Sequence, residues 1–261
     1  MTPGLGTRTP LLNVTDADFG RRVLASPVPT LVLFGASRDA ASRALKPALR
    51  ELAAHYAATL RVATIDAERA AWLAEQFGVA ATPTMLVVQG GDVVTRVVGF
   101  LPIGLLRLLF EQLAAGALPP DPLWSPTEET FEDVVVVPLL DQWGLTYVRQ
   151  APCPGPARGR IDILVYDRSP DQPLTLFENK RQIASTQALA QATVQAHRYA
   201  CALGLPSFVV AAPSGLWIYA SSRARAVELC RLTTLELQQH PDSVLALLRR
   251  QRSADMSTGG V

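Results

Sequence analysis

Two carboxylates and a lysine in the second half of the chain have the residue types of a site that hydrolyses phosphodiester bonds. Asp162 lies in the segment RIDILVYD, and Glu178 and Lys180 follow in LFENKR. Successive side chains of an extended strand point to opposite faces, so Glu178 and Lys180 project side by side. Phosphodiester hydrolysis needs a hard cation that polarises the phosphate and acidifies a water, and Mg²⁺ prefers oxygen ligands. Asp162 and Glu178 supply two carboxylates for such an ion.

The groups next to these acids extend the hypothesis. The backbone carbonyl of Asn179 is a candidate third metal ligand. Lys180 suits orienting or deprotonating the attacking water, or stabilising the pentacovalent phosphate, and its charge does not decide between these roles. Taken alone, the pattern D-x15-E-x-K is more typical of the solvated end of an ordinary strand. The surrounding elements therefore have to decide between the two interpretations.

The second half of the chain is predicted to be an α/β unit. A six-residue turn joins the apolar strands 160–167 and 174–180, which brings Asp162 close to Glu178 across the pair. Hydrophobic periodicity also predicts further elements: helices over 128–144 and 185–203 and near 241–251, and strands over 145–150, 207–213 and 216–220. Gln195 and Tyr199 lie four residues apart in the helix 185–203 and therefore share one of its faces.

The first half alternates helix and strand patterns. The predicted helices are 16–26, 41–59, 67–79 and 102–116, and the predicted strands are 30–36, 60–66 and a hairpin over 84–100. Such an alternation predicts a mixed α/β sandwich. Four prolines in residues 117–127 can continue neither a helix nor a regular ladder, so this stretch is predicted to be a linker.

The length of 261 residues agrees with two domains, at about 100–200 residues for each. The predicted domains are residues 13–116 and 128–250, joined by the linker 117–127. The ends, residues 1–12 and 251–261, are predicted to be disordered tails.

The first domain resembles the thioredoxin fold in its order of elements and in Thr82-Pro83, which matches the cis-proline of that family. Asp39-Ala40-Ala41-Ser42 stands where the family carries Cys-x-x-Cys, and Leu33 stands at the family's buried aspartate. No cysteine lies before residue 153, so thiol–disulfide exchange is excluded for this domain. The domain is expected to bind a partner, to dimerise or to position its neighbour. A vestigial site at Asp39, Ser42 and Pro83 could hold an extended peptide.

The second domain resembles the PD-(D/E)xK nuclease superfamily, and most of all the nuclease domain of type I restriction enzyme R subunits, over about residues 125–225. Four segments carry the resemblance: the opening helix TEETFEDVVVVPLLDQWG, the hairpin RIDILVYD to LTLFENKR, Gln195 to Tyr199, and SGLWIYA, which resembles the family's late strand pair. Within the helix, Glu129 is the best match to the family's early glutamate, with Glu128 and Glu132 as alternatives. One departure is Ile161, which stands where the family often has proline.

The resemblance implies a restriction-endonuclease-like α/β fold and a nuclease that uses Mg²⁺ or Mn²⁺. Asp162, Glu178 and Asn179 would hold the metal, Glu129 would bind it directly or through water, and Gln195 would fix the water or a phosphate oxygen. The residues expected to contact nucleic acid are Arg158, Arg160 and Tyr199. DNA is favoured over RNA, and the implied role is DNA processing or defence. Cutting two strands with one site per chain would favour a homodimer. The alternative is an inactive adaptor that binds nucleic acid or protein.

Composition adds weaker constraints. Lys and Arg total 24 and Asp and Glu total 23, so any basic surface must be local. The three cysteines have no metal-binding or Cys-x-x-Cys spacing, which favours a reducing, cytoplasmic setting. No apolar run approaches the length of a membrane span, and no membrane partner is expected.

Overall fold

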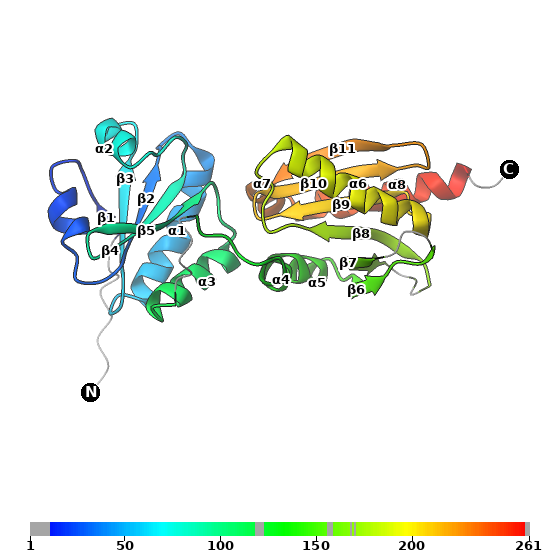
Figure 1. Cartoon of the computed structure of the whole chain (residues 1–261), viewed down its shortest axis with the longest axis horizontal. Coiled ribbons are helices and arrows are strands. Elements are labelled where there is room, and N and C mark those ends of the chain that lie inside the picture. Colours follow the sequence, from blue (N-terminus) through cyan, green and yellow to red (C-terminus); the bar gives the residue numbers. More distant parts are fainter. Residues whose placement is uncertain (1–10, 118–122, 156–158, 168, 170, 259–261) are drawn as a thin grey trace. The chain divides into compact units, whose positions relative to one another are not determined.

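The chain divides into two compact units, residues 1–125 and 126–261. The computed structural model describes residues 11–117, 123–155, 159–167, 169 and 171–258, with side chains up to residue 254 (Figure 1). Residues 118–122 of the predicted linker, and Arg158 among the predicted nucleic-acid contacts, lie outside the described residues. Within the described residues, no helix is both long and apolar enough to cross a bilayer.

The first unit is a mixed sheet with helical segments. Its strands are β1 (Leu12–Asn13), β2 (Thr30–Gly35), β3 (Arg61–Asp66), β4 (Thr84–Gln89) and β5 (Asp92–Val98). Its helical segments are η1 (Gly20–Leu24), α1 (Ala40–His55), α2 (Ala71–Gln76) and α3 (Ile103–Ala114). The strand order is β1-β3-β2-β4-β5, in which β1, β3 and β2 are parallel and β4 and β5 are antiparallel to their neighbours.

The core of the first unit follows from the apolar β2 segment, which is buried along its whole length. Val32 and Phe34 pack with residues of η1 and α2 on one face of the sheet. Strand alternation points Leu31 and Leu33 to the opposite face, which the buried leucines of α1 and α3 cover. The result is a sheet covered by helices on both faces.

The second unit is mostly strands in a separate sheet. Its strands are β6 (Thr146–Pro152), β7 (Arg160–Tyr166), β8 (Pro173–Asn179), β9 (Ser207–Ala212), β10 (Gly215–Ser221) and β11 (Ala226–Thr233). Its helical segments are α4 (Glu128–Phe131), η2 (Glu132–Val136), α5 (Val137–Gln142), α6 (Thr186–Leu203), α7 (Thr234–Gln239) and α8 (Pro241–Thr258). The strand order is β11-β10-β9-β8-β7-β6, and only β8 and β9 are parallel.

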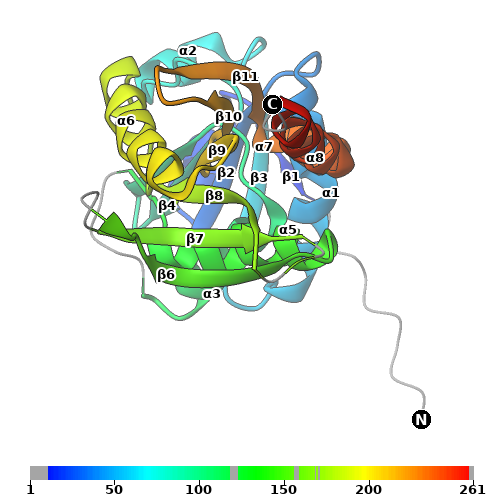
Figure 2. The same ribbon diagram turned by 90° about the vertical axis from the view of Figure 1, so that its right-hand side faces the viewer.

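Helices cover both faces of this second sheet. Figure 2 shows α6 on one side of the central strands and α8 on the other. Leu164 of β7 and Leu176 of β8 belong to the core cluster under α6. Because side chains alternate along a strand, Asp162 and Glu178 lie on the α6 face, and Asn179 lies on the opposite face.

The opening helix of this unit is not uniform. The predicted helix 128–144 is divided into α4, a π-helical turn η2, and α5. Pro138 explains the division, because proline lacks the N–H that an α-helical bond to residue 134 would need, and its ring crowds the preceding turn. The π-helical turn accommodates this conflict just after Glu132.

Two features at the end of the chain differ from the sequence prediction. Strand β11 was not anticipated, and α8 continues through Thr258 although a disordered tail was predicted from residue 251. The helix is held to the β7–β8 turn by arginines. Arg249 donates two hydrogen bonds to Asp167, at 2.8 and 2.9 Å, and Arg252 donates to the carbonyl oxygens of Gln172 and Pro173. These long-range contacts stabilise a segment whose composition is typical of a chain end.

Candidate functional site

The candidate site lies where β7 and β8 separate. Their ladder starts at Ile163 opposite Phe177, so Asp162 and Glu178 stand just beyond it. There the Asn179 backbone N–H donates to the Asp162 carboxylate Oδ2 at 2.7 Å. Strand β8 instead pairs with β9, and the Lys180 N–H donates to the Ala211 carbonyl at 2.8 Å. The two acids therefore occupy the fork between two neighbouring strands.

Glu178 is the most buried charged group of the site. Its side chain is fully buried, and its Oε1 accepts a hydrogen bond of 2.5 Å from the Lys180 ammonium. Its Oε2 is also buried and has no hydrogen-bond partner among the described residues. Burial, with added repulsion from Asp162, raises the pKa of Glu178 to about 7. An unpaired buried carboxylate oxygen is costly, which suits it to a cation.

Asp162 and Lys180 share this environment. Burial raises the pKa of Asp162, although the Asn179 N–H and the Lys180 charge oppose the rise. Burial acts to lower the pKa of Lys180, but the bond to Glu178 and the nearby negative charges outweigh it, and the pKa is raised. Lys180 is therefore held as an ammonium ion between carboxylates, ready to donate hydrogen bonds.

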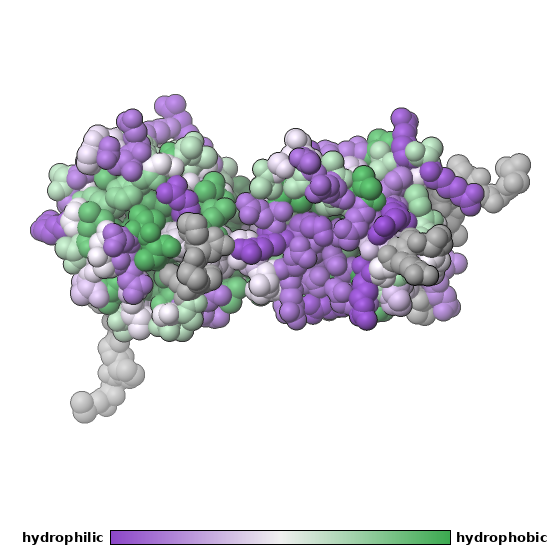
Figure 3. Space-filling model, in the orientation of Figure 1, coloured by the Kyte–Doolittle hydropathy of each residue, from purple (hydrophilic) through white to green (hydrophobic). Residues whose placement is uncertain are grey.

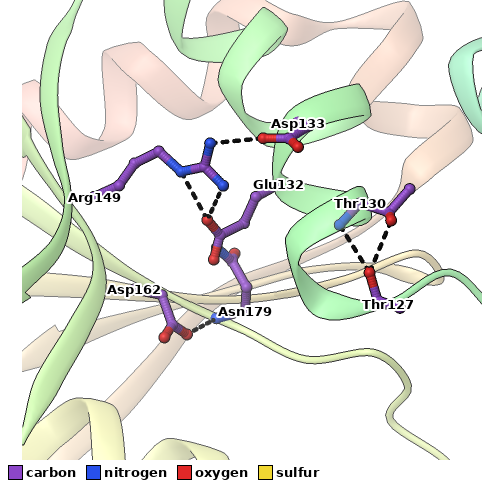
Figure 4. Close-up of polar contacts among 7 residues, drawn as sticks. All are labelled: Thr127, Thr130, Glu132, Asp133, Arg149, Asp162 and Asn179. Atoms are coloured by element: carbon purple, nitrogen blue, oxygen red, sulfur yellow. Dashed lines mark hydrogen bonds and ion pairs between the residues drawn. The ribbon is translucent and has the colours of Figure 1, made fainter.

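The opening helix brings further acids to the fork. Thr127 caps its first turn, since its hydroxyl accepts from the Thr130 N–H at 3.1 Å, as Figure 4 shows. Glu128 then accepts from the Arg181 N–H at 3.3 Å, and its charge contributes to the raised pKa values of both Asp162 and Glu178. Glu132, four residues later, adds to the raised pKa of Asp162.

Among the three helix glutamates, the structure brings Glu128 and Glu132 to the hairpin. Residues four apart share a helix face, whereas Glu129 is rotated by about 100° from Glu128. Glu129 is exposed, and no described side-chain contact joins it to the hairpin. The two alternatives, Glu128 and Glu132, are thus the glutamates that interact with the hairpin, because the rotation of the helix against the sheet decides which side chains meet it, and the role of Glu129 stays a prediction.

Arg149 of β6 holds Glu132 in place. Its Nε and Nη2 lie 3.1 and 3.0 Å from Glu132 Oε2, and its Nη1 lies 2.6 Å from Asp133 Oδ1. The Glu132 side chain is only 4% exposed. In Figure 4 the Glu132 carboxylate is turned toward Asn179, whose backbone N–H donates to Asp162. Sequence spacing gave no signal for Arg149, since strand pairing and helix packing create this contact.

The remaining predicted residues lie at different depths. Gln195 is half-buried on α6 and has no described hydrogen bond. Arg160 is exposed at the start of β7. Tyr199 is only 3% exposed and packs in the core under α6. A Cβ atom on Gly159 would lie 2.2 Å from the Tyr199 hydroxyl oxygen, so the ring is closed in by this backbone. The expectation that Tyr199 contacts nucleic acid is corrected, because a buried ring cannot stack on a base.

The donors of the fork fit a hard cation only in part. Among the described residues, no group of three or more His, Cys, Asp or Glu side chains is close enough to form a metal site by itself. Mg²⁺, however, keeps several waters and is usually held by one or two carboxylates together with phosphate oxygens. Asp162 and Glu178 match that pattern, since Asp162 Oδ1 and Glu178 Oε2 have no described hydrogen-bond partner. In Figure 3, hydrophilic residues dominate the visible surface of this unit over α4, α5 and β8.

The predicted vestigial site of the first unit is a helix cap. Asp39 caps α1 and accepts from the N–H groups of Ala41 and Ser42, at 3.0 and 3.1 Å, and from the Ser42 hydroxyl at 2.5 Å. Ser42 is fully buried, and the Thr82-Pro83 peptide bond is cis. A serine and a carboxylate that satisfy each other and the helix end leave no nucleophile here.

The comparisons with known proteins concern the first unit. Residues 10–109 match the Thioredoxin family. Thioredoxin 1 of Nostoc sp. is 35% identical over 89 residues, which are 34% of this chain and 83% of that protein. Thioredoxin of Haemophilus influenzae is 34% identical over 92 residues, which are 35% of this chain and 86% of that protein. The bifunctional thioredoxin reductase/thioredoxin of Mycobacterium leprae is 39% identical over 88 residues, 34% of this chain and 19% of that protein. Through this domain the chain belongs to the thioredoxin family, which confirms the predicted thioredoxin-like domain.

Proposed function

We propose that the second unit is a metal-dependent nuclease of the PD-(D/E)xK type and that the thioredoxin-like unit serves it as a redox-inactive adaptor. The observation that supports the nuclease most directly is the fork of β7 and β8. It gathers Asp162, Glu178 and Lys180, buries Glu178 completely and leaves its Oε2 without a described partner. Burying a carboxylate oxygen without a hydrogen-bond partner costs free energy, and a strand end that only faces water would not incur that cost.

Asp162 and Glu178 would hold Mg²⁺ or Mn²⁺, with the Asn179 carbonyl as a further oxygen donor, and Glu128 would bind it directly or through water. When bound, the ion would polarise the phosphodiester and acidify a water. Lys180 would place its ammonium charge at the phosphate and stabilise the negative charge that develops there. Gln195 is half-buried on α6, the helix that covers the sheet face carrying the acids, and it would fix the attacking water or a phosphate oxygen. Arg160, exposed at the start of the catalytic strand, would contact the nucleic-acid backbone.

The first unit is proposed to act through binding. Residues 1–152 contain no cysteine, and Asp39 and Ser42 are engaged in capping α1. A thioredoxin fold without thiols keeps a surface around cis-Pro83 that could hold an extended peptide backbone. The unit would then bring the nuclease to a protein partner or to a second copy of the chain. The whole protein would act in DNA processing or defence in the cytoplasm.

Cleavage assays on the full chain test the nuclease. The protein would be incubated with supercoiled, linear and single-stranded DNA and with RNA, in Mg²⁺ or Mn²⁺, beside Asp162→Asn and Lys180→Met. Asp171→Asn, an exposed position in the turn of the same hairpin, is the matched control. Cleavage that both site variants abolish and the control retains is the expected result. Glu128→Gln is expected to lower the rate more than Glu129→Gln.

The same experiment separates the nuclease from its alternative. An inactive adaptor would bind nucleic acid or protein equally well with and without Asp162 and Glu178, and it would have no need of a divalent ion. If no substrate is cut, and nucleic-acid binding is unchanged in the site variants with and without Mn²⁺, the nuclease proposal is wrong and the adaptor is supported.

A further inference from the structure

Arg149 makes an unusually complete set of contacts with the two acids of η2. Three of its nitrogen atoms are engaged: Nε and Nη2 with the same oxygen of Glu132, and Nη1 with Asp133 (Figure 4). A guanidinium is a planar, rigid fork of donors, so two bonds to one oxygen and a third to a neighbouring carboxylate fix both direction and rotation. Arg149 lies in β6, next to the catalytic strand β7, and therefore ties the opening helix to the sheet.

The contact leaves one side of Glu132 available. Both bonds from Arg149 reach Oε2, and Oε1 accepts no hydrogen bond among the described residues. The side chain is nevertheless only 4% exposed. In Figure 4 it is turned toward Asn179, whose side-chain amide is buried and has no described partner. Glu132 thus points from the helix to the strand end that carries the metal-binding residues, and Arg149 decides its direction.

The backbone of β6 departs from regular strand geometry directly after Arg149. Gln150, which follows Arg149, has a positive φ of 50°. The β6–β7 ladder pairs Arg149 with Ile163 and Ala151 with Ile161, so Gln150 stands beside Asp162. Non-glycine residues in this conformation are uncommon and are concentrated at functional sites. Strand β6 is therefore distorted next to Asp162, and Arg149 immediately precedes the distorted residue.

We propose that Arg149 is a positioning residue of the metal site, which holds Glu132 toward the fork of β7 and β8 so that the site binds a divalent ion. The inference rests on the proposed nuclease function, since it assigns a supporting role to a residue around the same ion. Glu132 adds its charge to the surroundings of Asp162, and it would reach the ion through a bound water or through its free oxygen. Residues that orient metal ligands in this way typically change metal affinity by about 10–100-fold when they are removed.

The direction in which the loss of Arg149 changes the affinity for a divalent ion distinguishes a positioning role from a purely electrostatic one. Removing a positive charge next to a group of carboxylates should by itself strengthen cation binding, since like charges repel. If Arg149 acts by holding Glu132, its removal should instead weaken binding, because the freed carboxylate can turn to solvent. A role confined to stabilising the fold would leave metal affinity unchanged in the folded protein.

Titration calorimetry with Mn²⁺ on the full chain tests the inference, and it needs no nucleic acid. Arg149→Met keeps the length of the side chain and removes its donors, and the expected result is Mn²⁺ binding weaker by about 10–100-fold. Arg149→Lys keeps the charge but cannot bridge both acids, so a smaller loss is expected. Arg231→Met is the control, since it removes an exposed arginine paired with Glu228 in the same unit. Thermal unfolding in EDTA establishes that each variant is folded.

The Mn²⁺ affinities of the wild type and the Arg149 variants decide whether the positioning role, or the metal site itself, is wrong. Mn²⁺ binding that is unchanged or stronger in Arg149→Met, with the variant folded, overturns the positioning role and leaves the nuclease proposal intact. If Arg149→Met does not fold, unchanged affinity in Arg149→Lys overturns it in the same way. A wild-type protein that takes up no Mn²⁺ removes the metal site itself, and the inference falls with the proposed function.

Discussion

The buried carboxylate of Glu178 makes the stability of the metal-free protein depend on pH in a defined direction. Burial, with repulsion from Asp162, raises its pKa in the folded protein from an ordinary value of 4.5 to about 7. The folded state then holds the proton more tightly than the unfolded chain. This contribution to stability is fully present below pH 4.5 and is lost as the pH rises to about 7 and beyond.

The magnitude follows from the difference between the two pKa values. A rise from 4.5 to about 7 corresponds to about 3 kcal/mol, at about 1.4 kcal/mol for each pH unit. Glu178→Gln keeps the shape of the side chain and an oxygen for Lys180, but it carries no charge. At pH 8 the variant should therefore be more stable than the wild type by about 3 kcal/mol, and near pH 4.5 the two should be equal.

Urea denaturation in EDTA at pH 4.5, 6 and 8 measures this difference. Tryptophan fluorescence reports on Trp143 and Trp217 in the second unit, and comparing variant with wild type cancels the contribution of the first unit. Asp171→Asn, in the exposed turn of the same hairpin, should follow the wild type at every pH. A difference between Glu178→Gln and wild type that is the same at pH 4.5 and pH 8, or a wild type that is the more stable at pH 8, would refute the reasoning.

Three further predictions concern the elements around the two units. Asp39→Ala removes the cap of α1 and should lower the free energy of unfolding of the first unit by about 1 kcal/mol, measured by urea denaturation. Gln150→Gly relieves the positive φ, so it should leave stability unchanged or raise it by up to about 1 kcal/mol, whereas Gln150→Val should lower it by about 1–2 kcal/mol in the same assay. Arg249→Met removes the two bonds to Asp167 and should speed hydrogen exchange in α8 with little change elsewhere; uniform exchange across the unit would contradict that local role.

Much of the fold could be predicted because its signals are local. The apolar run of β2 and the hairpins of both units are encoded in neighbouring residues, so alternation and turn composition locate them. The end of the chain was harder. Strand β11 has no buried residue and hence no clear apolar face. Helix α8 is held by Arg249 and Arg252 through contacts with residues about eighty positions earlier in the chain.

The sequence by itself determined which residue types each unit offers for chemistry. The absence of cysteine before residue 153 removes thiol chemistry from the thioredoxin-like domain, whatever its packing. The hairpin spacing likewise places Asp162 beside Glu178 and Lys180, since strand pairing and alternation follow from the short turn between them. These conclusions need only residue types and local geometry.

The tertiary structure decided which residues surround that chemistry. It brought Glu128 and Glu132 into interaction with the hairpin, buried Tyr199, and brought Arg149 to Glu132 across seventeen residues of sequence. A helix pattern gives the face that is apolar, but the rotation of the helix about its axis is set by the side chains it meets on distant strands. Burial depends in the same way on which segments pack together, so neither property can be read from the spacing of neighbouring residues.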